Sequence, residues 1–254
     1  MPPLVTIMLF AAFGGIASAA FAVGFLWLRE EQSAHLLPHL VSFATGALLG
    51  AACLALLPEA IKSAGPMRAG NVGLALLAGL GFFFIVEKLV LWWHSQSHAH
   101  EQARVQASGV LVLVGDSIHN ALDGVLIAAA FLTSPSLGFV TTLAVAAHEI
   151  PHRVGDFAIL VHAGFSRVRA LWLNLATGLA SPFGALLAYF VLRQTTAILP
   201  YALAFAAAGF LYIALAGLVP DLHRRAEPRA SILQVISIVA GVVVIAGAER
   251  LAVV

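Results

Sequence analysis

Charged side chains are scarce in this sequence. They make up 10% of the 254 residues, whereas 61% are hydrophobic and the mean hydropathy is +0.98. Because an ordinary soluble domain has about a quarter of its residues charged, this composition excludes such a fold and indicates a protein that crosses a membrane several times. The net charge of +1 and the lack of a basic stripe in the sequence give no sign of a nucleic-acid-binding surface.

Cysteine is nearly absent as well. Cys53 is the single thiol, so no disulfide can form within the chain. Its place inside a long apolar run predicts a small buried side chain and disfavours a soft metal ligand. A basic N-terminal start is also missing, and the first apolar run is too long for a signal core, so a cleaved signal peptide is not expected.

Long apolar runs fill most of the chain. A helix needs about 20 apolar residues to cross a bilayer, and on this measure the sequence predicts eight transmembrane helices. They cover residues 4–28, 37–61, 70–93, 106–132, 137–163, 170–192, 200–220 and 232–253. No segment remains for a soluble domain, so residues 1–254 are expected to form a single all-α, polytopic membrane domain.

The distribution of Lys and Arg predicts the orientation. Eight spans place both termini on the same side, and if the termini face outward, basic residues concentrate at the inner loops. The inner set is then Arg29, Lys88, Arg104, Arg167, Arg169, Arg224, Arg225 and Arg229, and the outer set is Lys62, Arg68, Arg193 and Arg250. Since inner loops are normally richer in Lys and Arg, we expect a multi-pass plasma-membrane protein, in a bacterium an inner-membrane one, with both termini extracytoplasmic.

The second and seventh spans end alike, in LLPEA (residues 56–60) and LVPDL (residues 218–222). Aligning the two prolines also matches Ala52 with Ala214. In the expected topology the two segments run in opposite directions across the membrane. This predicts an inverted repeat of spans one to three and six to eight, with spans four and five between them in a 3+2+3 arrangement.

Strong metal ligands interrupt the two middle spans. They are Asp116, His119, Asn120 and Asp123 in the fourth span, and His148, Glu149, His152 and Asp156 in the fifth. Spacings of three and four residues put most of each set on one helix face, with Asn120 one step to the side. Buried polar groups are costly unless paired, so two facing sets of imidazoles and carboxylates predict a mid-membrane site for zinc, with iron, manganese and cadmium as further candidates. A hydrogen-bonded network without metal is the alternative.

Pro151 lies between the two histidines of the fifth span. It cannot donate to the carbonyl of Ala147, and its ring disfavours the preceding turn. Membrane helices tolerate such breaks where the backbone lines a cavity. We therefore expect a kink and a water-accessible site at this depth.

Further polar residues outline a possible route for the ion. The candidates are Glu59, Asp116, Asp156, Asp221 and His223. Asp116 is expected at the outer entrance, whereas Glu59 and Asp221 are equally compatible with ordinary carboxylates at helix ends.

The loop after the third span carries three histidines within seven residues, His94, His98 and His100. This spacing predicts weak metal capture on the inner side, with a plain solvated loop as the alternative. Glu87 and Lys88, just before the loop, are expected to form an interfacial ion pair.

Together these motifs resemble the ZIP family of zinc and iron transporters. The strings HNALDG (residues 119–124) and HEIPHRVGDFAILVHAGFS (148–166) look like its two metal-binding helices, and LLPEA and LYIALAGLVPDLHRR (211–225) look like two further family segments. The resemblance implies an eight-helix transporter, expected as a homodimer, that moves divalent metal toward the cytoplasm by alternating access. It assigns ligand roles to His119, Asn120, Asp123, His148, Glu149 and His152.

One residue departs from this family pattern. Many members have Glu after the second histidine of the fifth span, and this chain has Arg153. A guanidinium stays charged in proteins and disfavours a second cation nearby. The sequence therefore predicts one dominant metal site in place of a two-metal centre.

The string HEIPH also satisfies H-E-x-x-H, the signature of zinc metalloproteases, and residues 122–124 (LDG) resemble a third-ligand motif of intramembrane proteases. An intramembrane protease is thus the alternative function. Pro151 inside the motif, His119 on the neighbouring helix and the inverted repeat favour a transporter. A metal sensor or a structural membrane subunit is a third alternative, which is less favoured because nothing in the sequence resembles an output domain.

Overall fold

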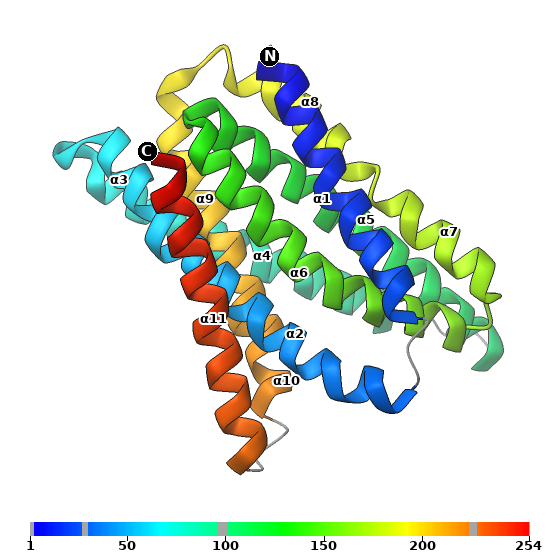
Figure 1. The fold of residues 1–254 in the computed structure, drawn as a ribbon. Coiled ribbons are helices and arrows are strands. Elements are labelled where there is room, and N and C mark those ends of the chain that lie inside the picture. Colours follow the sequence, from blue (N-terminus) through cyan, green and yellow to red (C-terminus); the bar gives the residue numbers. More distant parts are fainter. Residues whose placement is uncertain (1–2, 27–29, 96–100, 224–227, 254) are drawn as a thin grey trace.

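The structure is a computed structural model that describes residues 3–26, 30–95, 101–223 and 228–253 (Figure 1). Its α-helices are α1 (Pro3–Leu26), α2 (Glu30–Gly50), α3 (Leu57–Ala64), α4 (Ala69–Ser95), α5 (Glu101–Thr133), α6 (Pro135–His162), α7 (Arg167–Thr177), α8 (Ala180–Leu192), α9 (Leu199–Tyr212), α10 (Val219–His223) and α11 (Pro228–Val253). Two 3-10 turns, η2 (Pro66–Arg68) and η3 (Thr196–Ile198), and two π-helices, η1 (Ala51–Leu56) and η4 (Ile213–Leu218), complete the described elements. The all-α prediction is confirmed.

Each of the eight expected spans coincides with helical structure. The second is formed by α2, η1 and α3 and the seventh by α9, η4 and α10, whereas the sixth is divided into α7 and α8 around Gly178. Among the described residues, six segments are long and apolar enough to cross a membrane: His35–Ala64, Pro66–Leu89, Val112–Thr133, Arg167–Leu192, Leu199–Leu218 and Ser231–Leu251. The remaining expected spans are α1, where Pro3–Gly15 counts only as a shorter apolar helix, and α6, whose polar site residues lower its hydropathy.

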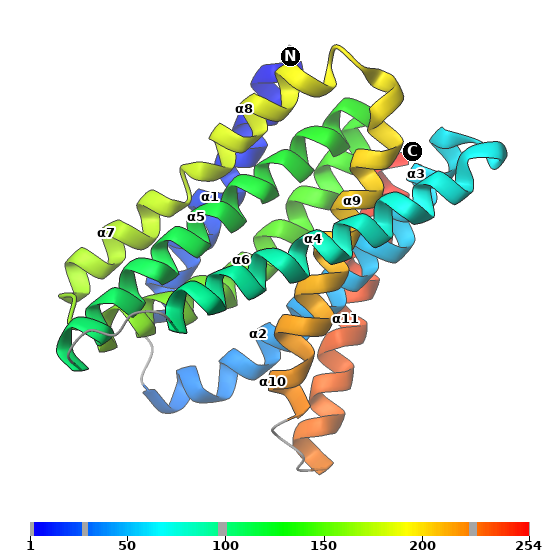
Figure 2. The same cartoon turned by 180° about the vertical axis from the view of Figure 1, so that it is seen from behind.

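The start of α1 and the end of α11 lie at the same end of the helical bundle, which we call the terminal end (Figures 1 and 2). The starts of α2 and α5 and the ends of α6 and α10 lie at the opposite end, which we call the loop end. This placement is what an even number of crossings produces.

Glycines join two helix pairs closely. A Cβ at Gly124 of α5 would overlap the carbonyl oxygen of Ser181 in α8, and Gly184 of α8 meets the backbone of α5 in the same way. Gly46 and Gly241 make equivalent backbone contacts between α2 and α11. Small residues permit such close approach of membrane helices, so α5–α8 and α2–α11 are tightly packed pairs.

The buried apolar core fills the half of the bundle toward the terminal end. It includes Leu48, Ala51, Ala52, residues 126–130, Val140, Ala144, Val145, Leu203, Ala207 and Phe210. Its many alanines let the helix backbones approach one another and leave little space between them.

The two π-helices occupy matching places in the two segments that the sequence aligns. Each contains six residues, and each begins seven residues before its proline, Ala51 before Pro58 and Ile213 before Pro220. Helices of this type are rare and are frequently found at functional sites. The extra residue per turn also rotates side chains: Cys53 of η1 is exposed, so the prediction of a buried thiol is wrong.

Candidate metal-binding site

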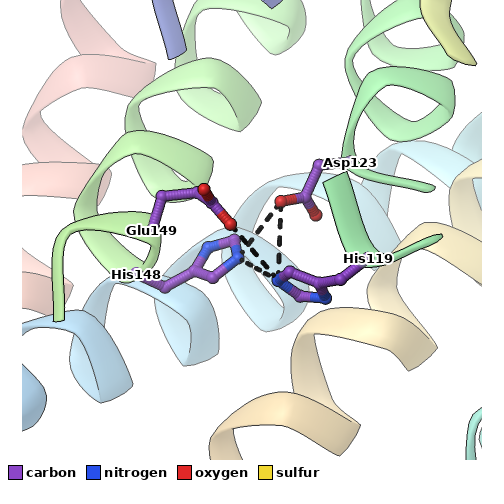
Figure 3. A group of neighbouring side chains, drawn as sticks. All are labelled: His119, Asp123, His148 and Glu149. Carbon is purple, nitrogen blue, oxygen red and sulfur yellow. Dashed lines mark hydrogen bonds and ion pairs between the residues drawn. The ribbon is translucent and has the colours of Figure 1, made fainter. Parts of the chain in front are cut away.

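Helices α5 and α6 bring four of the expected ligands together, and we call them the quartet: His119, Asp123, His148 and Glu149 (Figure 3). One donor atom from each lies within 4.8 Å of the others. His119 and Asp123 are one helical turn apart on α5, and His148 and Glu149 are neighbours on the facing side of α6. The four-residue spacing on α5 thus brings its two ligands together, whereas α6 contributes two adjacent residues to the quartet.

The donor atoms of the quartet are separated by distances that suit zinc. The His119 and His148 Nε2 atoms lie 3.1 Å apart, and Asp123 Oδ2 lies 3.3 Å from His148 Nε2 and 3.7 Å from His119 Nε2. Glu149 Oε1 lies 3.5 Å from His119 Nε2. Tetrahedral zinc with bonds of about 2.0–2.2 Å separates its ligand atoms by about 3.3–3.6 Å, and these four separations lie close to that range.

Burial gives the quartet its electrostatic character. Asp123, His148 and Glu149 are almost fully buried, and among the described residues Asp123 Oδ2 and Glu149 Oε1 have no hydrogen-bond partner. A buried carboxylate oxygen without a partner is costly. Two such oxygens beside two imidazoles form a site that a divalent cation stabilises.

His148 is held in the orientation that a ligand needs. Its Nδ1 lies 3.1 Å from the carbonyl oxygen of Ala144, which can only accept, so Nδ1–H donates and Nε2 keeps its lone pair for the quartet. The ring of Phe210 contacts the imidazole edge-on, with 6.1 Å between the ring centroids.

His152, expected among the same ligands, belongs to a second group with Asp116 and Asp156. Its Nδ1 lies 3.0 Å from Asp156 Oδ2 and 3.7 Å from Asp116 Oδ1. Its ring stacks on that of His119, with centroids 5.0 Å apart and an interplanar angle of 13°. The two groups are therefore adjacent and joined through two imidazoles.

Asn120 does not join the quartet. Its Nδ2 donates to the backbone oxygen and to Oδ1 of Asp116, and its Oδ1 accepts from Arg153 at 2.9 Å. The Asn120 Oδ1 atom, which was expected as a metal ligand, thus faces the Arg153 guanidinium.

Arg153 is fully buried beside the quartet. Its Nε lies 2.9 Å from Glu149 Oε2 and donates to Ser18 Oγ of α1, and its Nη1 donates to Oδ1 and the backbone oxygen of Asn174 in α7. Ser18 and Asn174 are site residues that sequence reasoning missed, since a serine among small residues and a lone asparagine give no signal of this contact.

A cavity of about 540 Å³ adjoins both groups on the side of the loop end. It is lined from α2, α4, α5, α6, α9 and η4, and His119, Pro151, His152 and Asp156 form part of its wall. Helix α6 continues through Pro151. The cavity beside Pro151 agrees with the expected accessible site, whereas the expected kink stays a prediction.

Comparison with known proteins identifies the family. A family model described as "ZIP Zinc transporter" matches residues 94–249, which include every donor of both groups. This chain belongs to the ZIP family of zinc transporters. The zinc transporter ZIP13 of Pongo abelii is 40% identical over 85% of this chain and 68% of its own length, and human ZIP13 is 35% identical over 85% and 72%. Mouse zinc transporter SLC39A7 is 31% identical over 89% of this chain and 66% of its own length.

Family membership establishes the broad activity of this ZIP protein. It is a multi-pass membrane transporter of metal ions with zinc as the transported substrate, and it is not an enzyme. The protease interpretation of HEIPH is not supported, and Gly124 of the LDG string has a packing role against α8 instead.

The position of Asp116 on α5 bears on the expected entrance of the transport route. Asp116 precedes His119 on α5, whose start lies at the loop end, so it is on the same side of the quartet as Asp156 and the cavity. In the orientation predicted from Lys and Arg the loop end is the inner side. In that orientation Asp116 lies on the inner side of the quartet, so the expected outer entrance and the expected orientation do not agree with each other.

Other residues expected on the route lie away from both groups. Glu59 accepts from Ser63 at 3.0 Å and from Lys62 at 3.4 Å, as a carboxylate at a helix end does. His223 is exposed at the end of α10. His98 and His100, together with the side chains of His94 and Asp221, lie outside the described residues.

Glu87 is a cavity residue with an unexpected partner. Its carboxylate accepts a hydrogen bond from the hydroxyl of Tyr212, which links α4 to α9, and both residues line the cavity. The expected ion pair with Lys88 is wrong, because the Lys88 ammonium lies 5.8 Å from the centroid of the Phe84 ring.

Proposed function

We propose that this ZIP protein carries zinc toward the cytoplasm by alternating access and that the quartet is its central transport site. The observation that carries the proposal is the convergence of two imidazole nitrogens and two carboxylate oxygens within 4.8 Å of one another, buried beside a cavity. Of the six residues expected as ligands, His119, Asp123, His148 and Glu149 bind the ion directly in this proposal. Asn120 and His152 act beside them.

The accessibility of the quartet supports alternating access. The cavity reaches His119 from the loop end, whereas the alanine-rich core covers the quartet toward the terminal end. Access from one side with closure on the other is what a carrier needs in each of its states. The tight pairs α5–α8 and α2–α11 would move as units in the exchange between these states.

The internal symmetry supports the 3+2+3 arrangement of a single domain. The matching π-helices η1 and η4 extend the alignment of Pro58 with Pro220 from sequence to backbone geometry. In this arrangement α5 and α6 lie between the two repeats, where transporters of this kind bind their substrates.

The orientation of the protein in the membrane gives the direction of zinc transport. With Lys and Arg concentrated at the loop end, both termini are extracytoplasmic and the cavity opens to the cytoplasm. The plasma membrane, in a bacterium the inner membrane, and a homodimeric assembly complete the proposal. Light scattering of the purified protein tests the dimer, and a mass of one chain would contradict it.

Arg153 supports one dominant metal site. Its guanidinium takes up Glu149 Oε2 and Asn120 Oδ1, two oxygens that a second cation beside the quartet would need. Zinc titration of the purified protein is expected to give one tight site per chain. Two tight sites, both lost in His119→Ala, would contradict this.

The mixture of nitrogen and oxygen ligands favours zinc and admits iron, manganese and cadmium. Such a set also binds less tightly than thiolates would, which permits release. Competition of each metal with labelled zinc in the flux assay gives the order of preference.

Uptake of radiolabelled zinc into proteoliposomes tests the central claim. Saturable uptake is expected for the wild type and is expected to be lost in His148→Ala and Asp123→Ala. His35→Ala, which removes an exposed histidine of α2, is the matched control and retains uptake. Full uptake in His148→Ala would refute the proposed site.

A further inference from the structure

We infer that Asp116, His152 and Asp156 form a second, weaker zinc-binding station on the wall of the cavity, which receives the ion from the quartet. The inference rests on the proposed transport function and adds a defined intermediate position to it. It begins from the donor atoms of these three side chains, which all lie within 4.8 Å of one another.

The chemistry of the three side chains fits a divalent cation. Two carboxylates and one neutral imidazole balance the charge of zinc, and His152 Nδ1 already lies 3.0 Å from Asp156 Oδ2 and 3.7 Å from Asp116 Oδ1. A zinc site with three protein ligands keeps an open position for water. Such a site exchanges its ion more readily than one closed by four protein ligands.

Asp116 shows that the group is incomplete without a ligand. The residue is 3% exposed, and among the described residues its Oδ2 has no hydrogen-bond partner, although Asn120 satisfies Oδ1. A buried carboxylate oxygen facing a second carboxylate group carries a large desolvation cost. A bound cation between Asp116 and Asp156 removes that cost.

The station lies where an ion would go after leaving the quartet. Exposure of the side chain rises from 1% at His148 to 18% at His119 and 37% at His152. The rings of His119 and His152 are stacked 5.0 Å apart, and both residues line the cavity. The ion therefore has a short path from a buried four-ligand site to a partly exposed three-ligand site.

Arg153 places a positive charge beside both groups. It is paired with Glu149 of the quartet and bonded to Asn120, which in turn bonds to Asp116. This fixed cation lowers the affinity of the station for zinc, and an ion bound in the quartet lowers it further by like-charge repulsion. The two positions are consequently expected to fill in sequence and with unequal affinity.

Equilibrium binding of radiolabelled zinc to the purified full-length protein tests the station. The wild type is expected to bind one ion tightly and a second more weakly. Asp156→Asn and Asp116→Asn are expected to keep the tight step and weaken the second at least about tenfold, a loss typical of altering a metal-site carboxylate. His148→Ala is expected to lose the tight step only.

Two controls keep the result interpretable. Glu87→Gln removes a carboxylate from the same cavity wall but keeps an oxygen for Tyr212, and is expected to leave both binding steps unchanged. Asp156→Glu retains the charge and is expected to keep part of the second step. Equal thermal midpoints for Asp156→Asn and the wild type show that folding is intact; if Asp156→Asn does not fold, binding to Asp116→Asn decides the question.

The outcomes separate the station from the transport proposal. A wild type without a second step, or a second step insensitive to both aspartate variants, overturns the station. If His148→Ala abolishes flux in proteoliposomes while Asp156→Asn changes neither binding nor flux, only the station fails. If His148→Ala keeps full flux, the proposed transport function fails together with the station.

Discussion

Arg153 joins α6 to α1, α5 and α7 through one guanidinium, and its replacement by glutamine is expected to be strongly destabilising. The residue is fully buried and pairs with Glu149 at 2.9 Å. It also donates to Ser18, Asn120 and Asn174 at 2.6–3.0 Å. Arg153→Gln leaves the Glu149 carboxylate buried without its cation and removes most of these hydrogen bonds.

The size of the effect follows from the burial. Removing one partner of a buried ion pair costs about 3–5 kcal/mol. The hydrogen bonds belong to the same network, so their contributions do not add independently to this figure. For a protein of this size, about 2–4 °C of melting temperature corresponds to 1 kcal/mol, and the expected decrease is about 6–20 °C.

Thermal unfolding of the purified protein with a metal chelator measures this effect without zinc. Glu149→Gln alone also leaves a buried charge unpaired, whereas the double variant removes both charges. The double variant is therefore expected to lose at least about 2 kcal/mol less than the two single losses combined. Arg193→Gln, at an exposed arginine bonded to Tyr189, is the control and is expected to cost less than about 1 kcal/mol. Additive single losses, or an Arg153→Gln effect as small as the control, would refute the reasoning.

Two further predictions concern the packing and the cavity. Gly124→Ala is expected to separate α5 from α8 and to lower the thermal midpoint and the zinc flux, because its Cβ would overlap a backbone carbonyl. Gly81→Ala is the control and is expected to be tolerated, since there is open space around Gly81. Equal thermal midpoints for the two variants would contradict the close contact. In a Cys53→Ser background, Ile159→Cys on the cavity wall is expected to react with a membrane-impermeant thiol reagent in inside-out vesicles. Ala129→Cys in the buried core is expected to resist the same reagent. Equal labelling of both cysteines would contradict the closed core.

Much of the fold follows from the sequence, because helices in a membrane need only apolar length and internal hydrogen bonds. The expected spans coincide with helices for this reason. The division of the sixth span at Gly178 was not predicted, since its apolar run is continuous. The exposure of Cys53 was not predicted either, because a π-helix changes which side chains face the core, and apolar runs carry no signal for it.

The site was predictable to the level of helix faces. Residues four apart share a face, so the convergence of His119 with Asp123 could be expected from spacing. The same rule pairs His148 with His152, which the structure places in the second group instead. The rotation of α5 about its own axis decides whether the oxygen of Asn120 faces the metal or Arg153, and spacing does not fix that rotation. Partners from distant helices, such as Ser18, depend on packing between segments far apart in the sequence.

The alanine-rich core beyond the quartet also forms an electrostatic barrier to the passage of a zinc ion. A bare divalent ion in a medium of alanine, leucine and phenylalanine side chains would lose its hydration at a cost of tens of kcal/mol, roughly. Under the proposed alternating-access mechanism, this conformation therefore carries no ionic current, and passage of zinc requires a rearrangement of the helices. Such rearrangements take about microseconds to milliseconds, so a carrier of this kind moves zinc in discrete steps while the membrane remains insulating.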